Sequence, residues 1–383
     1  MNYISSNKIE NKRILLRCDF NVPVKNNKVV DDSKIIRSID TIKLLLNNNN
    51  KVIILSHFGR IKSEDDKINN TLYPVYEELK KYIDIDFISD PFNLDDINNS
   101  NKLCFLVENT RYTDVPEKKE SINDLELSKY WSQFADVFVI DAFASLHRAH
   151  SSTAGISNYL KTYFGLLVEE EINNLEPLIN NNKHPFTVIM GGAKASDKIK
   201  IIEGILERCD KLILTGGILN TFLKVIGKSV GKSLVSDDED VLESVKNILD
   251  KYENKIFFSN EFKINRNNEI LTVLLDEIED NDIIYDNLIN NKIFTDSKII
   301  FFNGTCGMYE DNNYKSGTQS LLKDLSHIES DVYIGGGDTV TAVNTLGFNN
   351  EFKYLSSGGG ATLEYVAYGK LKALEYIKEN GVI

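Results

Sequence analysis

The sequence predicts an α/β protein with two lobes, each built as a parallel β-sheet with helices on both faces. Short apolar runs alternate with segments of helical period through the first half of the chain, and the same alternation resumes after residue 185. Repetition of strand, helix and strand builds parallel sheets with crossover helices. A length of 383 residues also suggests two or three domains.

The first lobe alternates predicted strands and helices. Each strand is a short apolar run, and each helix carries apolar residues at helical spacing. We expect strands at Ile14–Leu16, Val52–Leu55, Leu103–Val107 and Val137–Ile140, and helices at Ile35–Leu46, Leu72–Ile83 and Leu125–Phe134.

An amphipathic segment separates the lobes. Its apolar residues recur at helical spacing from Leu166 to Ile179, and glutamates lie opposite. We expect a helix that joins the lobes and serves as a hinge. The predicted boundaries are therefore 1–165 for the first lobe, 166–180 for the hinge helix and 181–364 for the second lobe.

The second lobe repeats the pattern of the first. A helix-like stretch at Ile218–Val225 follows one of its apolar runs. We expect further strands at Thr187–Met190, Leu212–Leu214, Ile299–Phe302, Val332–Ile334 and Tyr354–Leu355, and further helices at Ile199–Arg208 and Val241–Tyr252.

Composition excludes several classes of function. The chain has 44 basic and 57 acidic residues and a formal charge of −13, which argues against general binding to nucleic acid or an anionic membrane. Its four cysteines lie far apart, as in proteins of a reducing cytosol. Neither a secretory signal nor an apolar run of spanning length is present. We therefore expect a cytoplasmic protein with neither nucleic-acid nor membrane partners.

Polar and cationic residues follow the predicted strands of the first lobe. Ligand sites of parallel sheets lie beyond the carboxyl ends of the strands. In an acidic protein, cations that converge on one edge imply an anionic ligand. The segments concerned are Asp19–Asn21, Ser56–Arg60, Glu108–Arg111, Asp141 and His147–His150.

Glycines follow the predicted strands of the second lobe. Glycine lets backbone N–H groups approach phosphate oxygens, and the helix that follows supplies a positive dipole end. Several such turns suggest a polyphosphate, with Lys194 and Lys198 adding charge and Asp338 placed to hold nucleotide-bound Mg²⁺. The turns are Gly191–Lys194, Thr215–Gly217, Asn303–Gly304, Gly335–Asp338 and Ser356–Gly360.

Other motifs are weaker. His147–His150 could bind a metal, but no third ligand has suitable spacing, so anion binding is favoured. Gly227–Ser233 is similar to a P-loop, yet its first glycine is displaced by one and no strand precedes it. The dinucleotide fingerprint also fails, which disfavours a dehydrogenase. Cys306 could be a nucleophile, although no base adjoins it in sequence and a structural thiol is favoured.

The motifs, in their order along the chain, closely resemble those of phosphoglycerate kinases. The resemblance spans nearly the whole sequence. It rests on Arg17–Pro23, Ser56–Arg60, Glu108–Tyr112, Asp141–Phe143 with His147–His150, Gly191–Lys198, Asn303–Gly304 with Gly307 and Glu310, Gly335–Thr339 and Ser357–Ala361.

This resemblance implies two Rossmann-like lobes across a cleft, with the terminal segment 365–383 packing back on the first lobe. It implies reversible phosphoryl transfer between ATP and the carboxylate of 3-phosphoglycerate, with Mg²⁺ as cofactor. The catalytic residues would be Lys34, Lys198, Gly359 and Gly360. The triose phosphate would be held by Asp19, Phe20, Asn21, Lys34, His57, Phe58, Gly59, Arg60, Arg111 and Arg148. The nucleotide would be held by Gly191, Lys194, Lys198, Asn303, Glu310, Gly336, Gly337, Asp338 and Thr339, with Asp338 binding the metal.

The sequence departs from this family at several positions. Lys34 stands where the family has a catalytic arginine, and Arg37, one helical turn on, is a candidate substitute. A Gly-Pro-Lys-Thr run that helps to frame the nucleotide site is missing near 281–284. Thr215 replaces a glycine, and Thr305–Cys306 replaces Pro-Met. The tail also lacks the usual Leu-Pro-Gly and reads Leu-Lys-Ala from Leu371.

Two hypotheses of different class follow from the sequence. The first is an active glycolytic kinase, favoured by the retained lysine, aspartate and arginines. The second is a non-catalytic relative that binds a nucleotide or a triose phosphate and acts as a scaffold, for which Lys34 is the main argument. An enzyme with its site inside one chain needs no second copy, so we expect a monomer.

Overall fold

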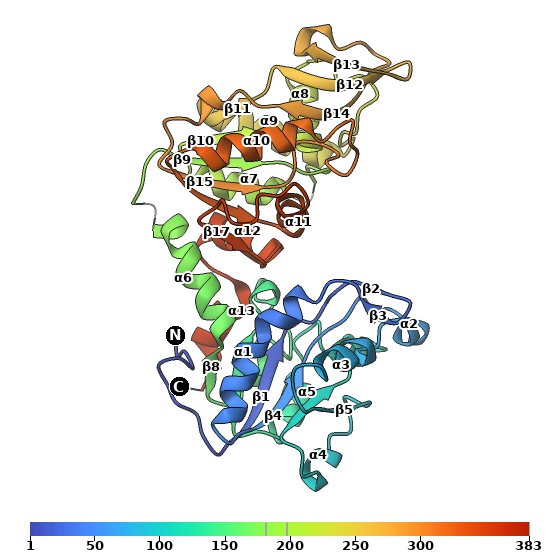
Figure 1. Ribbon diagram of the computed structural model, residues 1–383, viewed down its shortest axis with the longest axis vertical. Coiled ribbons are helices and arrows are strands. Elements are labelled where there is room, and N and C mark those ends of the chain that lie inside the picture. Colours follow the sequence, from blue (N-terminus) through green and yellow to red (C-terminus); the bar gives the residue numbers. More distant parts are fainter. Residues whose placement is uncertain (181, 197, 383) are drawn as a thin grey trace. The chain divides into compact units, whose positions relative to one another are not determined.

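The computed structural model describes residues 1–180, 182–196 and 198–382, which form two compact units (Figure 1). The first unit comprises Met1–Asn173 and the chain from Lys370 onwards, and the second comprises Asn174–Gly369. Asp197, which belongs to the Gly191–Lys198 motif, lies outside the described residues, as do the boundary residues Asn181 and Ile383 of the predicted segments.

The first unit is built on a six-stranded sheet in the order β5-β6-β4-β1-β7-β8, and every neighbouring pair is parallel. In its centre, Leu16 of β1 pairs with Ile54 of β4 and Val139 of β7. All three side chains are fully buried, as expected for a parallel sheet covered on both faces. The strands are β1 (Arg13–Cys18), β4 (Lys51–Leu55), β5 (Asp86–Ile88), β6 (Cys104–Val107), β7 (Val137–Asp141) and β8 (Thr162–Phe164).

Helices cover both faces of this sheet. α1 connects β1 to β4 in one direction across the sheet, and α5 leads from β6 to β7 in the other direction. Right-handed crossovers then place these two helices on opposite faces. The helices of this unit are α1 (Ser33–Asn47), α2 (Glu64–Asn69), α3 (Tyr73–Leu79), α4 (Asp96–Asn99), α5 (Leu125–Ser132) and α13 (Lys372–Asn380), with short 3-10 turns η1 (Thr110–Asp114), η2 (Phe143–Ser145) and η3 (Gly155–Asn158) and a hairpin of β2 (Val24–Lys25) and β3 (Lys28–Val29).

The second unit repeats this architecture. Its six-stranded sheet has the order β11-β10-β9-β15-β16-β17 and is also parallel throughout. The strands are β9 (Phe186–Met190), β10 (Lys211–Leu214), β11 (Ile256–Phe258), β15 (Ile299–Asn303), β16 (Asp331–Gly335) and β17 (Tyr354–Ser356). The helices are α7 (Ile199–Leu206), α8 (Gly216–Val225), α9 (Glu239–Tyr252), α10 (Ser316–His327), α11 (Gly337–Thr345) and α12 (Gly360–Tyr368), with short 3-10 turns η4 (Glu253–Lys255), η5 (Leu275–Glu277) and η6 (Asn291–Ile293).

The predicted fold class is confirmed, because both main sheets are parallel and alternate with helices. α6 (Leu166–Asn180) lies where the sequence predicts the hinge helix, and the boundary between the units falls inside it. α3 is shorter than predicted, since its last turn ends at Leu79 and Ile83 lies beyond it. No helix among the described residues combines the length and apolar character needed to cross a membrane.

A small antiparallel sheet in the second unit was not predicted. Its strands β12 (Glu261–Arg266), β13 (Glu269–Leu274) and β14 (Ile283–Leu288) follow the order β13-β12-β14. The turn between β12 and β13 consists of Asn267 and Asn268, both with positive φ. Two asparagines between apolar runs are typical of a tight hairpin, so this signal was available in the sequence.

Candidate active site

In the first unit, the functional side chains lie at the carboxyl ends of four neighbouring strands. Asp19 follows β1, His57 follows β4, Arg111 lies in η1 after β6, and Arg148 lies after β7 and η2. The structure thus places these predicted residues at one edge of the sheet. Their charges influence one another, since Arg17 and Arg148 both lower the pKa of Arg111, which burial lowers first.

Asp19 is an ionised carboxylate at the centre of this cluster. Its Oδ2 lies 3.1 Å from Nζ of Lys34, and its Oδ1 accepts a hydrogen bond from the backbone N–H of Asn21. Burial alone would raise the pKa of Asp19, but Lys34, His57 and Arg17 lower it to about 2. Lys34 is therefore held by an anion at this edge.

Arg37 does not join this cluster. Its guanidinium lies 3.0 Å from Glu171 and 3.1 Å from Glu170 in α6. Glu171 is fully buried, so this pair fixes α1 against α6. Among the described residues of α1, only Lys34 forms an ion pair with Asp19.

The loop after β4 is shaped by hydrogen bonds to its backbone. Asn21 accepts from the N–H of Gly59 at 3.0 Å, and Arg111 donates to the Gly59 carbonyl. Phe20 and Phe58 are buried in the hydrophobic core of this unit, so they anchor the segments after β1 and β4. Arg60 is exposed, and we find no hydrogen bond or ion pair for it within the described chain.

Two buried charged residues of this site were not identified from the sequence. Arg17, inside β1, is only 1% exposed and lies 3.0 Å from Nδ1 of His57. Glu120 is fully buried and accepts from the N–H of Ser152 at 3.0 Å. A charge within an apolar strand was the signal for Arg17, whereas nothing in the local sequence marks Glu120.

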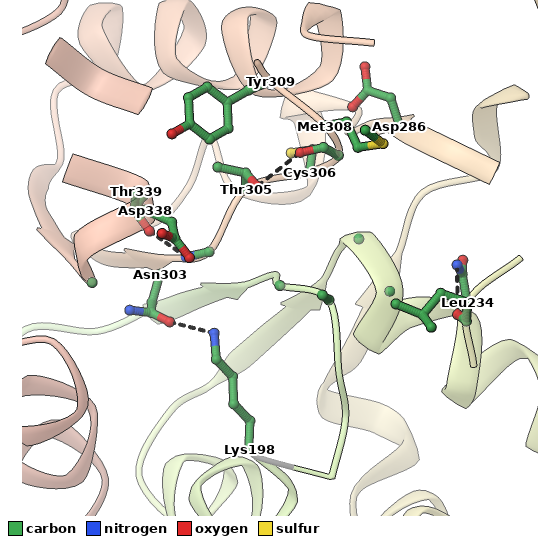
Figure 2. Close-up of a pocket in the computed structure, with 18 of the residues that line it drawn as sticks. Lys198, Leu234, Asp286, Asn303, Thr305, Cys306, Met308, Tyr309, Asp338 and Thr339 are labelled. Atoms are coloured by element: carbon green, nitrogen blue, oxygen red, sulfur yellow. Dashed lines mark hydrogen bonds between the residues drawn. The ribbon is translucent and has the colours of Figure 1, made fainter. Parts of the chain in front are cut away.

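The second unit contains a pocket of about 680 Å³ at the carboxyl ends of its parallel strands (Figure 2). Such a volume and its largely apolar lining with a few polar groups are typical of small-molecule sites. Its walls come from the loops after β9, β10, β15, β16 and β17 and from β14. The predicted residues that line it are Lys198, Asn303, Glu310, Gly336, Gly337, Asp338, Thr339, Gly359 and Gly360.

Lys198 is oriented in this pocket by two oxygen atoms. Its Nζ donates to Oδ1 of Asn303 at 2.8 Å (Figure 2). It also donates to the Gly191 carbonyl at 2.8 Å. Asn303 in turn donates from Nδ2 to the Gly335 carbonyl at 2.7 Å, which fixes its amide. Gly191 thus acts through its carbonyl, and Lys194 is exposed and does not line the pocket.

Two helices begin at the rim of the pocket. Gly336, with a φ of +97°, precedes α11, and a Cβ there would lie 2.4 Å from Nδ2 of Asn303. Gly359, with a φ of +56°, precedes α12. At Gly337, Gly359 and Gly360 a Cβ would meet no atom within 4 Å, so these backbones face open space. The two helix N-termini can therefore receive an anionic ligand.

Three of the departures from the family pattern contact one another. Thr215 donates to the Thr305 carbonyl at 3.3 Å, and the backbone N–H of the next residue, Cys306, donates to Oγ1 of Thr318 at 3.0 Å. Burial raises the pKa of Cys306 far above its usual value. The thiol is therefore structural, and the bonds from Thr215 and Cys306 hold the Asn303–Gly307 loop in place.

β14 frames the pocket where the Gly-Pro-Lys-Thr run is missing. Asn287 accepts from the N–H of Gly216 at 2.9 Å, and Asp286 accepts from the N–H of Gly317 at 2.6 Å. These bonds tie the strand to α8 and α10. Burial raises the pKa of Asp286 to about 6. Sequence reasoning missed several lining residues here: Asn220, Leu234, Ile283, Ile284, Tyr285, Asp286 and Met308.

The weaker motifs do not form sites. The P-loop-like segment 227–233 follows the end of α8 and does not line the pocket. Within the described residues no group of three or more His, Cys, Asp or Glu side chains could hold a metal. All four cysteines are buried and free.

A protein with two parallel-sheet units, one with clustered cations and the other with a lysine and helix N-termini around a pocket, falls in the class of α/β proteins that bind phosphate-bearing ligands. The comparisons with known proteins give the particular family. The family model for phosphoglycerate kinase matches residues 4–370. The chain therefore belongs to the phosphoglycerate kinase family.

Individual relatives agree with this assignment. The chain is 38% identical to the phosphoglycerate kinase of Mycoplasmoides gallisepticum, with 97% of each chain covered. It is 37% identical to that of Staphylococcus aureus, covering 98% of this chain and 99% of the other. The solved phosphoglycerate kinase of Coxiella burnetii aligns with a TM-score of 0.83 and 30% identity over 98% of both chains. These relatives give the scaffold hypothesis no support.

Proposed function

We propose that the chain catalyses reversible phosphoryl transfer between ATP and the carboxylate of 3-phosphoglycerate. The observation that supports this most directly is Lys198, held by Asn303 at a pocket whose rim carries the N-termini of α11 and α12. Membership of the family supplies the substrates. A second function has no observation in its favour.

In this proposal the second unit binds the nucleotide. Its phosphates meet Lys198, the side chain of Asn303 and the N-termini of α11 and α12. Thr339 fixes the strand end beside them, because its Oγ1 accepts from the N–H of Gly304 at 2.6 Å. The base and ribose occupy the part of the pocket lined by Leu234, Tyr285 and Glu310.

Asp338 is the proposed Mg²⁺ ligand. It lies in the first turn of α11, lines the pocket and is exposed there. Mg²⁺ usually takes one or two carboxylates and completes its shell with substrate phosphates and water, so a single aspartate fits. When bound, the ion neutralises charge on the phosphates. Lys198 and the helix N-termini continue this neutralisation toward the transferred group.

The first unit holds 3-phosphoglycerate in this proposal. Arg60, Arg111 and Arg148 neutralise its phosphate, while Asp19, Asn21 and His57 orient the rest of the molecule. The substrate carboxylate is ionised at neutral pH and needs no general base. Catalysis then consists of positioning and of charge neutralisation, with Lys34 and Lys198 acting on the moving phosphoryl group together with the N–H groups of Gly359 and Gly360.

Further properties belong to the same proposal. α6, which contains the boundary between the units, is the proposed hinge for a closure that excludes water during transfer. Each binding site uses residues of one chain, which supports a monomer. Four free, buried cysteines support a reducing compartment such as the cytoplasm.

A coupled assay tests the proposal. Purified protein is mixed with 3-phosphoglycerate and Mg-ATP, and formation of 1,3-bisphosphoglycerate is followed. The expected result is turnover that is lost in Lys198→Ala. Binding of both ligands without turnover would contradict the proposal and favour the scaffold hypothesis.

A further inference from the structure

The contact between Arg17 and His57 defines the state of the histidine. A terminal nitrogen of the Arg17 guanidinium lies 3.0 Å from Nδ1 of His57, which is a hydrogen-bond distance. Oδ1 of Asp19 lies 3.9 Å from the same nitrogen, which is too long for a hydrogen bond. Arg17 is therefore the hydrogen-bond partner of Nδ1.

Arginine can only donate in this contact. Its guanidinium has five N–H donors and no acceptor, and it does not lose its proton in proteins. Nδ1 must therefore offer its lone pair. A neutral imidazole with an unprotonated Nδ1 carries its proton on Nε2, and an imidazolium would set two N–H groups against each other.

We propose that Arg17 is a positioning residue that fixes His57 as the neutral tautomer protonated on Nε2. This inference rests on the proposed function and deepens it, because it states how His57 meets the triose phosphate. The ring presents one N–H donor to an oxygen of the substrate and adds no charge.

Arg17 is itself held rigidly. Its Nε donates to Oγ of Ser152 at 2.8 Å, and its guanidinium also donates to the Cys18 carbonyl. The Ser152 hydroxyl donates to the buried carboxylate of Glu120, which also accepts from the N–H of Ser152. A buried carboxylate, a serine and an arginine thus form one chain of hydrogen bonds that ends at His57.

The charges around the ring agree with this assignment. His57 is faced by Arg17 and Asp19 from the β1 segment, by Lys34 from α1 and by Arg111 from η1. Burial and the three cations lower the pKa of His57 well below its usual 6.5, and only Asp19 opposes them. We find no hydrogen bond to Nε2 in the described part of the chain, so this nitrogen is available to a ligand.

The state of His57 can be read directly by NMR. Ligand-free, full-length protein is labelled with ¹⁵N in its histidines, and long-range ¹H–¹⁵N spectra are recorded between about pH 5 and 8. The His57→Gln variant lacks the His57 signals, so comparison with its spectrum assigns them. The expected pattern is an unprotonated Nδ1 and a protonated Nε2 that do not change with pH. A protonated Nδ1, or a titration step near the usual value, would overturn the proposal.

Variants test whether Arg17 is the cause. In Arg17→Gln, His57 should gain a titration step, because Asp19 is then opposed by fewer cations, and KM for 3-phosphoglycerate should rise more than kcat falls. Arg17→Met removes every donor without removing the bulk of the side chain, and it serves if Arg17→Gln does not fold. It too should shift Nδ1 toward an average of the two tautomers, and an unchanged spectrum in either Arg17 variant would remove Arg17 from this role.

Arg13→Lys is the matched control. Arg13 lies on the same strand but pairs with Asp136 at the surface, so its replacement should leave the His57 signals unchanged. The spectra need no turnover. If the chain lacked kinase activity, the tautomer could still be assigned, so failure of the proposed function and failure of this inference remain distinguishable.

Discussion

At the scale of single residues, Lys34 is the substitution with the clearest chemical consequence. A lysine offers one compact charge, whereas the arginine of the family offers a planar fork that can hold two oxygens. In this chain the ammonium is bound to Asp19 at 3.1 Å. Arg37 cannot supply the missing donors there, because its guanidinium is paired with Glu170 and Glu171.

We expect Lys34→Arg to raise kcat by about threefold to tenfold, because a bidentate cation stabilises the transferred group better. Lys34→Ala should lower kcat by on the order of 10²-fold or more, as loss of a charge-stabilising donor does. The coupled assay measures both. Lys43→Ala, at an exposed position of the same helix, is the control, and its kcat should stay within about twofold. A lower kcat in Lys34→Arg would show that the site is built around an ammonium.

Residues at this scale also show what can be predicted from sequence. His57, Arg111 and Asp338 could be identified because each follows an apolar strand, and strand ends of a parallel sheet share one edge. The roles of Arg17 and Glu120 could not, since Ser152, which joins them, lies 135 residues from Arg17 along the chain. Tertiary packing brings such partners together, and the local sequence pattern around each residue gives no information about that packing.

At the scale of elements, the first turn of α6 is fixed by side chains from two neighbours. Asp141, at the end of β7, accepts from the N–H groups of Leu167 at 2.9 Å and Val168 at 3.3 Å, and Thr41 of α1 accepts from that of Leu166. Gly165 permits this approach, because a Cβ there would lie 2.3 Å from Asp141. Burial raises the pKa of Asp141 to about 7.

This raised pKa makes a pH-dependent contribution to stability. The folded protein keeps the proton of Asp141 up to about pH 7, whereas the unfolded chain releases it near 3.8. Stability from this group is thus present at low pH and lost as the pH rises from about 4 to about 7. Relative to Asp141→Asn, the wild-type protein should lose on the order of 4 kcal/mol of unfolding free energy over this range.

Urea denaturation of the two proteins at several pH values measures this difference. The control is Asp136→Asn, at the exposed position just before the same strand, where a hydrogen-bonded ion pair with Arg13 lowers the pKa of Asp136. The difference in unfolding free energy between the wild type and Asp136→Asn should not fall as the pH rises. A pH-independent difference for Asp141→Asn would show that the carboxyl is ionised throughout.

At the scale of the whole molecule, the alternation of strands and helices predicted both parallel sheets. It did not predict the antiparallel sheet of β12, β13 and β14, because these six-residue strands mix polar with apolar residues and do not alternate with helices. The same sheet supplies β14 to the pocket of the second unit. Sequence reasoning therefore missed elements and residues whose positions depend on contacts between segments far apart in the chain.

The end of the chain is expected to serve the triose site, because α13 belongs to the first unit. Leu371 and Ala373 are fully buried, and the N–H of Ala373 donates to the Leu146 carbonyl at 3.0 Å. Leu146 directly precedes His147 and Arg148. Removal of the chain from Lys370 onwards should raise KM for 3-phosphoglycerate by about tenfold or more, because cations displaced by even about 1 Å bind poorly.

The second unit keeps all of its pocket residues in this truncation, so Kd for ATP should change by less than about twofold. Steady-state kinetics and calorimetric titration of ATP measure the two effects separately. Leu374→Ala, a milder change in the same helix, should move KM in the same direction by a smaller factor. Equal losses of affinity for 3-phosphoglycerate and for ATP would contradict this separate effect on the triose site. They would show that α13 stabilises the protein as a whole.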